Sequence, residues 1–150
     1  MNLLVAGGAG FIGSNFCHRL ERYGHRAVVV DALTYAGSRE HIADIPDSIL
    51  TFVHANIEDG AVMERIFDEG IPGKPFDAVI NFAAESHVDR SIAEALPFVR
   101  SNVLGAVVLL EAARKARVPI FVQVSTDEVY GSTSNAAGFS PNDPLNPTSA

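Results

Sequence analysis

Short apolar segments alternate with amphipathic segments along most of this chain. The apolar segments predict strands at Asn2–Ala6, Arg26–Asp31, Leu50–His54, Ala78–Phe82 and Ile120–Ser125. Between them, apolar residues at helical spacing predict helices at Phe11–Gly24, Ser38–Ala43, Asp59–Glu69 and Pro97–Lys115. The strands show no alternation of polar and apolar positions, which is typical of a parallel sheet covered on both faces. The pattern therefore predicts an α/β fold with a doubly wound parallel sheet.

Composition narrows the possible partners. The chain has 150 residues, 47% of them hydrophobic, which suits one domain with a buried core. A net charge of -7 argues against nucleic acid or an anionic membrane surface as partner. The single cysteine, Cys17, allows no disulfide framework and favours a reducing, cytoplasmic location. We expect neither a signal peptide nor a membrane span, since no apolar run reaches roughly 18 residues.

A glycine-rich segment follows the first predicted strand. Gly7, Gly10 and Gly13 lie between that strand and a helical pattern, which is the context of a dinucleotide-binding turn. In such a turn the first glycine permits a tight bend, the second lets the backbone approach a pyrophosphate, and the third lets the helix pack closely. The amides of Phe11 and Ile12 at the helix start favour a bound phosphate. An ordinary glycine-rich turn is the alternative.

Asp31 ends the second predicted strand. A carboxylate at this point can accept hydrogen bonds from the ribose hydroxyls of adenosine, and it repels a 2′-phosphate. It therefore favours NAD over NADP. For Asp31 alone, a helix cap or a turn residue is the alternative, but the glycine-rich segment upstream favours the cofactor.

A polar cluster follows the fifth predicted strand. Asp127 and Glu128 are adjacent there, at the end of a strand where open α/β sheets place their chemistry. Two carboxyl groups can divide the roles of general acid and general base. A solvated turn is the alternative. The scattered histidines predict no metal site.

These motifs resemble those of the extended short-chain dehydrogenases/reductases, and most closely the dTDP-glucose 4,6-dehydratases. The matching segments are Gly7–Ser14, Asp31–Gly37, Ala83–Ser91 and Ser125–Gly131. Related sugar epimerases share the glycine-rich turn but lack the adjacent Asp and Glu. The resemblance implies a Rossmann-type sheet with strand order 3-2-1-4-5, in which residues 1–150 form an incomplete NAD-binding domain.

The resemblance also implies NAD as cofactor and a nucleotide sugar as substrate. The implied cofactor-binding residues are Gly7, Gly10, Phe11, Ile12, Gly13, Asp31, Thr34, Gly37, Asn56, Ile57, Ala83, Ala84 and Ser86. Ile57 would flank the adenine. Two residues at the adenosine end depart from the family, because Ala32 replaces the usual Lys and Asn56 the usual Asp. Asn56 can still accept from the adenine amino group.

The implied reaction converts dTDP-glucose to dTDP-4-keto-6-deoxyglucose. Hydride passes from C4 of the sugar to the cofactor, water leaves across C5–C6, and the hydride returns to C6. Thr126 would hydrogen-bond the sugar near the oxidised hydroxyl. Asp127 would protonate the departing hydroxyl, and Glu128 would take the proton from C5.

The predicted helix Pro97–Lys115 carries two further expectations. Asn102 is expected to be buried, to find hydrogen-bond partners and, by resemblance, to help order the active site. The stripe Val103, Val107 and Leu110 is predicted to belong to the core. By resemblance, a homodimer is expected through helices that include this one.

The family also uses a Tyr-x-x-x-Lys pair, which would follow Asn146–Ala150 directly. Tyr23, Tyr35 and Tyr130 have no lysine four residues later. We therefore expect the later strands and a substrate domain to lie outside this chain, and the chain alone to be inactive. One alternative is another nucleotide-sugar epimerase or decarboxylase of the same superfamily. If the chain is complete at residue 150, the alternative is a non-catalytic NAD-binding module.

Overall fold

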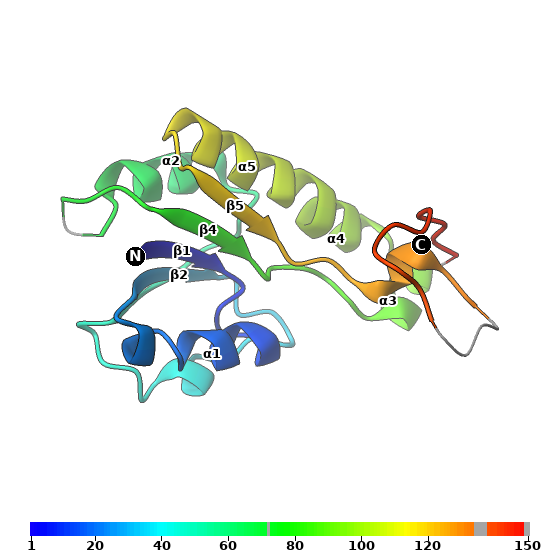
Figure 1. Ribbon diagram of the computed structural model, residues 1–150, viewed down its shortest axis with the longest axis horizontal. Coiled ribbons are helices and arrows are strands. Elements are labelled where there is room, and N and C mark those ends of the chain that lie inside the picture. Colours follow the sequence, from blue (N-terminus) through cyan, green and yellow to red (C-terminus); the bar gives the residue numbers. More distant parts are fainter. Residues whose placement is uncertain (72, 134–137, 149–150) are drawn as a thin grey trace.

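The computed structural model describes residues 1–71, 73–133 and 138–148. Within these residues the chain forms a five-stranded, all-parallel sheet with helices on both faces (Figure 1). Its strands are β1 (Asn2–Ala6), β2 (Arg26–Asp31), β3 (Leu50–His54), β4 (Ala78–Asn81) and β5 (Ile120–Gln123). They pair in the order β3-β2-β1-β4-β5. The predicted fold class and strand order are therefore confirmed.

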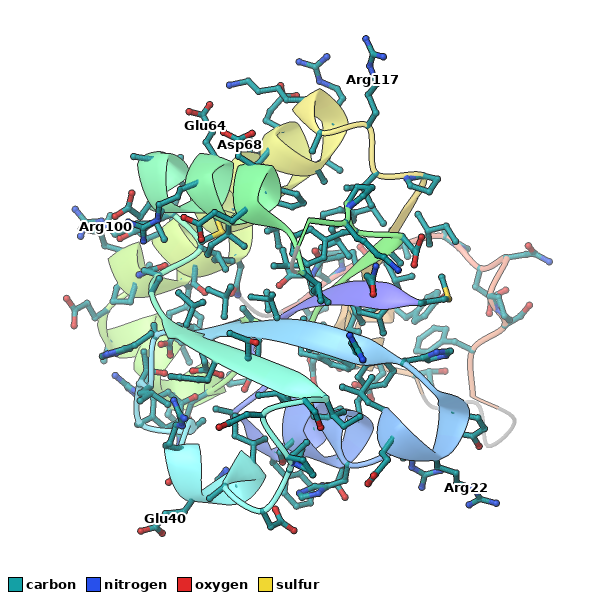
Figure 2. The ribbon with its side chains drawn as sticks, turned by 90° about the vertical axis from the view of Figure 1, so that its left-hand side faces the viewer. Arg22, Glu40, Glu64, Asp68, Arg100 and Arg117 are labelled. Atoms are coloured by element: carbon teal, nitrogen blue, oxygen red, sulfur yellow. The ribbon has the colours of Figure 1, made fainter. Side chains whose placement is uncertain are left out.

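The helices form a layer on each side of the sheet (Figures 1 and 2). One layer holds α1 (Phe11–Cys17) and the 3-10 helices η1 (Glu21–Tyr23) and η2 (Arg39–Ile42). The other holds α2 (Gly60–Glu69) and a continuous run of α4 (Leu96–Phe98), the π-helical η3 (Val99–Gly105) and α5 (Ala106–Lys115). Beyond the carboxyl ends of the strands lie α3 (Val88–Ala93) and the 3-10 helix η4 (Asp127–Tyr130).

Successive residues of β1 enter two separate cores. Leu4, which pairs with Val28 and Val79 in register, belongs to the core beneath α2 and α5. Leu3 and the residues that pair with it in register on β2 and β4 belong to the core beneath α1 and η2. Because both faces of the central strands are covered, these strands must be apolar throughout.

The predicted helix Phe11–Gly24 is broken in the structure. α1 ends at Cys17, and Leu20 turns into the core before η1 begins. Gly24 then adopts the left-handed conformation, with φ of 65°, which starts the return to β2. Burial raises the pKa of the Cys17 thiol to about 12, so this cysteine stays protonated and unreactive.

Two helix starts are set by capping side chains. The hydroxyl of Ser38 accepts a hydrogen bond from the amide of Glu40. The carboxylate of Asp59 accepts from the amide of Val62 at 3.1 Å. Both predicted helices therefore begin one residue later than the pattern suggests, because the capping residue itself lies outside the helix. On the outer surface, Glu64 of α2 pairs with Lys115 of α5 at 2.6 Å, and Figure 2 shows Glu64 facing away from the sheet.

The prediction that Val103, Val107 and Leu110 belong to the core is wrong. These side chains are 58%, 53% and 48% exposed, whereas Leu109 on the opposite side of α5 is fully buried. The helical run is apolar on two faces, and sequence spacing does not show which face meets the sheet. By length and a mean hydropathy of 1.4 alone, the run Leu96–Lys115 falls within the range of a membrane span, so the expected absence of a span stays a prediction. The other face of this run nevertheless packs on the sheet.

Candidate active site

A groove crosses the carboxyl ends of the strands. Its volume of about 1540 Å³ exceeds the roughly 300–1,000 Å³ of ordinary small-molecule pockets. The predicted cofactor-binding and catalytic residues all line this groove: Gly7, Gly10, Phe11, Ile12, Gly13, Asp31, Thr34, Gly37, Asn56, Ile57, Ala83, Ala84, Ser86, Thr126, Asp127 and Glu128. The fold thus brings together turns that follow all five strands. The individual roles of these residues stay predictions.

Packing requires glycine at two positions of the turn between β1 and α1. Gly7 has φ of +73°, and a Cβ there would lie 2.5 Å from the amide nitrogen of Ala83. A Cβ on Gly13 would collide with the carbonyl oxygen of Gly7. These glycines let the turn approach β4 and let α1 approach the turn.

Gly10 is required by neither backbone conformation nor packing. Its φ of -77° and ψ of 174° are accessible to any residue. Among the described residues, a Cβ there would meet only the carbonyl oxygen of Gly7, at 3.4 Å. No described residue accepts a hydrogen bond from the amides of Phe11 and Ile12, which follow at the start of α1. An open space beside free amides suits a bound anion, so the residues present fit a dinucleotide pyrophosphate.

Asp31 holds the glycine-rich turn as well as lining the groove. Its Oδ2 accepts a hydrogen bond from the amide of Ala9 at 2.9 Å, and its Oδ1 accepts from the amide of Leu33 at 2.8 Å. Gly37 packs against it closely, since a Cβ there would lie 2.8 Å from Oδ1. Asp31 therefore does stabilise a turn, which was the alternative interpretation of this residue. Each carboxylate oxygen can accept one more hydrogen bond, so the side chain can also serve a ribose hydroxyl.

Asn56 and Ile57 lie in the groove after β3. The side-chain oxygen of Asn56 accepts from the amide of Glu58 at 3.1 Å, which uses one of its two lone pairs. Ile57 is buried, and a Cβ on Gly105 would lie 2.7 Å from it, so η3 packs tightly against this end of the groove. The remaining lone pair of Asn56 is still available to a ligand.

A hydrogen-bonded pair of side-chain amides at the ends of β4 and β5 was not foreseen. Asn81, at the end of β4, is fully buried, and its Nδ2 donates to Oε1 of Gln123 at the end of β5 at 2.8 Å. The amide of Ala83 donates to Oδ1 of Asn81 at 3.0 Å, and Nε2 of Gln123 donates to the carbonyl of Val124 at 3.1 Å. The pair links the loops that follow β4 and β5. The sequence contains one signal of this pair, because each of the two apolar strands ends in a residue with a side-chain amide.

The predicted catalytic residues lie on the turn that follows β5. The hydroxyl of Thr126 accepts from the amide of Glu128 at 3.2 Å and lies 3.3 Å from Oδ1 of Asp127. Thr126 therefore caps η4, and both carboxylates stand exposed on this short helix. The turn presents two carboxyl groups to the groove, as acid–base chemistry requires.

The loop after β4 is tied to the π-helical segment η3. The amide of Glu85 donates to Oδ1 of Asn102 at 2.8 Å, and Nδ2 of Asn102 donates to the carbonyl of Glu85 at 2.8 Å. Asn102 does find partners, but it is exposed rather than buried, contrary to expectation. A π-helical turn shifts the side chains that follow it, which is a common feature of functional sites.

The described end of the chain returns to the groove. The amide of Asn146 donates to the carbonyl of Val129 at 2.9 Å, and Pro147 lines the groove beside the catalytic turn. The segment that the resemblance places before Tyr-x-x-x-Lys therefore passes the predicted acid and base. Its last two residues, Ser149 and Ala150, lie outside the described residues.

Comparison with known proteins gives matches along nearly the whole chain. The profile of the family described as GDP-mannose 4,6 dehydratase matches residues 4–150. A dTDP-glucose 4,6-dehydratase of Mycolicibacterium smegmatis is 46% identical over 153 residues, covering 99% of this chain and 44% of that protein. The chain spans slightly less than half the length of the curated relatives it matches.

Solved structures of two activities share the fold. The crystal structure of DesIV, a dTDP-glucose 4,6-dehydratase of Streptomyces venezuelae with NAD bound, is 44% identical with a TM-score of 0.88, covering 99% of this chain and 46% of DesIV. A UDP-glucose 4-epimerase of Thermotoga maritima, solved with UDP-glucose, is 34% identical with a TM-score of 0.86, covering 99% of this chain and 46% of the epimerase. The fold alone therefore does not separate dehydration from epimerisation.

The two glycines of the turn should respond oppositely to alanine. Gly13→Ala should lower the free energy of unfolding by about 1–3 kcal/mol, because its Cβ collides with backbone that must move. Gly10→Ala should leave stability unchanged or raise it by about 0.4–1 kcal/mol, because its backbone conformation already suits alanine. Urea denaturation of both variants measures the difference. Equal losses would show that Gly10 is packed by the protein and not open to the groove.

Proposed function

This chain belongs to the family of GDP-mannose 4,6 dehydratases, and we propose that it forms the NAD-binding domain of an enzyme that dehydrates a nucleotide sugar. The observation that carries the proposal is a single groove with an open glycine-rich turn at its middle, after β1, and the Asp127–Glu128 pair at its β5 edge. The relatives named dTDP-glucose 4,6-dehydratase support dTDP-glucose as the substrate. We place the enzyme in the cytoplasm, since Cys17 is buried and free.

NAD fits the groove through residues at the ends of β1, β2 and β3. The space at Gly10 and the amides of Phe11 and Ile12 would receive the pyrophosphate. Asp31 would accept from the ribose hydroxyls, and Ile57 would flank the adenine. When bound, NAD supplies a reversible hydride acceptor at the sugar end of the groove.

The residues after β5 would carry the proton transfers. Thr126 orients the sugar by a hydrogen bond near its C4 hydroxyl. Once C4 is a ketone, the neighbouring C5 hydrogen is acidic, and Glu128 removes it as a proton. Asp127 gives a proton to the C6 hydroxyl, which leaves as water. Each well-placed transfer contributes about 10²–10⁴-fold to the rate.

Epimerisation of a nucleotide sugar is the competing function, because the epimerase of Thermotoga maritima shares the fold. Epimerisation at C4 breaks no bond at C5 or C6, so it has no use for an acid and a base aimed at those atoms. The adjacent carboxylates Asp127 and Glu128 therefore favour dehydration. Identification of the reaction product distinguishes the two functions. A 4-keto-6-deoxy sugar supports the proposal, and a C4 epimer overturns it.

We also propose a homodimer formed through the exposed face of the helical run Leu96–Lys115. This face carries apolar side chains three and four residues apart, namely Leu96, Val99, Val103, Val107 and Leu110. An exposed apolar stripe of this kind is typical of a protein interface.

The proposed position of the NAD pyrophosphate can be tested by a substitution at Gly10. Gly10→Ala should weaken NAD binding by about tenfold or more, because the loss of a charge-assisted hydrogen bond costs roughly 1.5–3 kcal/mol. Calorimetric titration with NAD, on the protein as its gene encodes it, measures the affinity. An unchanged urea midpoint is the control for folding. NAD affinity equal to that of the parent protein would mean that the pyrophosphate does not lie at Gly10.

The acid and the base are separable in deuterated water. Glu128→Gln should slow exchange of the C5 hydrogen with solvent by about 10²–10⁴-fold. Asp127→Asn should still allow hydride loss from C4 but slow the loss of water. Single-turnover reactions followed by absorbance of the reduced cofactor and by mass spectrometry distinguish these steps. C5 exchange at the parent rate in Glu128→Gln would remove Glu128 from the role of base.

The dimer is tested by a charge at Val99, because Val99 does not line the groove, whereas Val103, Val107 and Leu110 of the same face do. Val99→Asp should convert the dimer to monomer at micromolar concentration, because it would bury an unpaired carboxylate. Tyr23→Asp, an equally exposed position on the opposite layer, is the matched control and should remain dimeric. Sedimentation velocity measures both. A parent protein that sediments as a monomer would contradict the proposal.

A further inference from the structure

Tyr35 and Arg90 meet across two loops that lie far apart in sequence. Tyr35 lies in the loop after β2, and Arg90 lies in α3, which follows β4. The guanidinium carbon of Arg90 lies 4.4 Å from the centre of the Tyr35 ring, well within the range of roughly 6 Å for a cation–π contact. Arg90 also reaches back, with its Nη1 lying 3.9 Å from Oε2 of Glu85.

The sheet order decides what this contact spans. β2 and β4 lie on opposite sides of β1. A contact between the loops after β2 and β4 must therefore pass beyond the carboxyl end of β1, where the glycine-rich turn lies. Thr34 and Ala36, on either side of Tyr35, line the groove, and so does Ser91, next to Arg90. The contact thus joins the two walls of the groove on their outer side.

One end of this bridge is fixed and the other end is free to open. The side chain of Glu85 is 11% exposed, and its backbone is held by Asn102 through two hydrogen bonds. Tyr35 and Arg90 are both about half exposed, at 54% and 51%. Cation–π contacts and ion pairs of exposed groups are individually weak. The side chains of Tyr35 and Arg90 can therefore separate while the loop after β2 stays held by the hydrogen bonds of Leu33 to Asp31 and of Ser38 to Ala9.

We propose that Glu85, Arg90 and Tyr35 form a clasp that retains the cofactor in the groove between turnovers. This proposal rests on the proposed function. In that reaction the hydride returns to the same sugar, so the cofactor leaves each turnover in its starting form and needs no exchange. A bridge over the outer side of the groove slows dissociation without touching the reacting atoms. Arg90 and Tyr35 are then positioning residues, and Glu85 is the anchor that orients Arg90.

The test is the dissociation rate of NAD, measured on the protein as its gene encodes it. NAD-loaded protein is diluted into excess competing NADH, and release is followed by fluorescence. Tyr35→Ala should raise the dissociation rate about two- to fivefold, the factor that an exposed cation–π contact supplies. Tyr35→Phe keeps the aromatic face and should release NAD at the parent rate. Arg90→Gln in the Tyr35→Ala background should add no further increase, because the two side chains act through one contact.

The outcomes separate the clasp from the proposed function. No NAD binding by the parent protein would overturn both. NAD binding with the same dissociation rate in the parent protein and Tyr35→Ala would overturn the clasp alone. A faster release in Tyr35→Phe equal to that in Tyr35→Ala would also overturn it, since the hydroxyl rather than the ring would then matter. The urea midpoint of the cofactor-free Tyr35→Ala variant should fall no further than the loss of one exposed contact explains, and a larger fall would show a structural role for Tyr35 and overturn the clasp.

Discussion

The site depends on how the glycine-rich turn is held at Ala9. The amide of Ala9 donates to Asp31, while its carbonyl accepts from the amide of Ser38 at 3.1 Å and from Nδ1 of His41 at 2.8 Å. The turn is thereby tied to the loop after β2 at a point that is completely buried. This bonding gives Asp31 a structural role, because without it the free amides at the start of α1 would lose their fixed direction. A ligand that binds there meets donors already in place, so little ordering opposes binding.

Strands were the most predictable part of the fold, and the reason is local. β1, β2 and β3 have the predicted bounds. In β1 and β2 an apolar run leaves no choice of face, whereas β3 includes the exposed polar residues Thr51 and His54. The predicted ends of β4 and β5 were too long, at Phe82 and Ser125. There the side-chain amides of the buried Asn81 and the exposed Gln123 take over hydrogen bonding, and the chain leaves the sheet earlier than its apolar residues suggest. The motifs located the groove for the same reason, since parallel strands bring the turns after them to one edge.

Tertiary contacts account for what the sequence pattern could not supply. The helical run Leu96–Lys115 is apolar on two sides, so only its packing shows that Leu109 is buried and Val107 exposed. α3 was missed because six residues offer too few helical turns for a periodic signal. Tyr35 and Arg90 belong to two matched segments, yet neither segment indicates that they touch. Their contact follows from the order of β2, β1 and β4 in the sheet.

The strand order also separates the two tasks of the groove. Most residues that suit a dinucleotide follow β1, β2 and β3, with Ala83, Ala84 and Ser86 after β4, whereas the carboxylate pair follows β5 at the far edge. The loop after β4 lies between them and is fixed from two directions, by Asn81 below and by Asn102 behind. A dehydratase and an epimerase can share this scaffold, because similar structures of both activities have been solved with NAD. Under the proposed function, what distinguishes the two reactions lies at the β5 end, where Asp127 and Glu128 would supply the acid and the base that only dehydration requires.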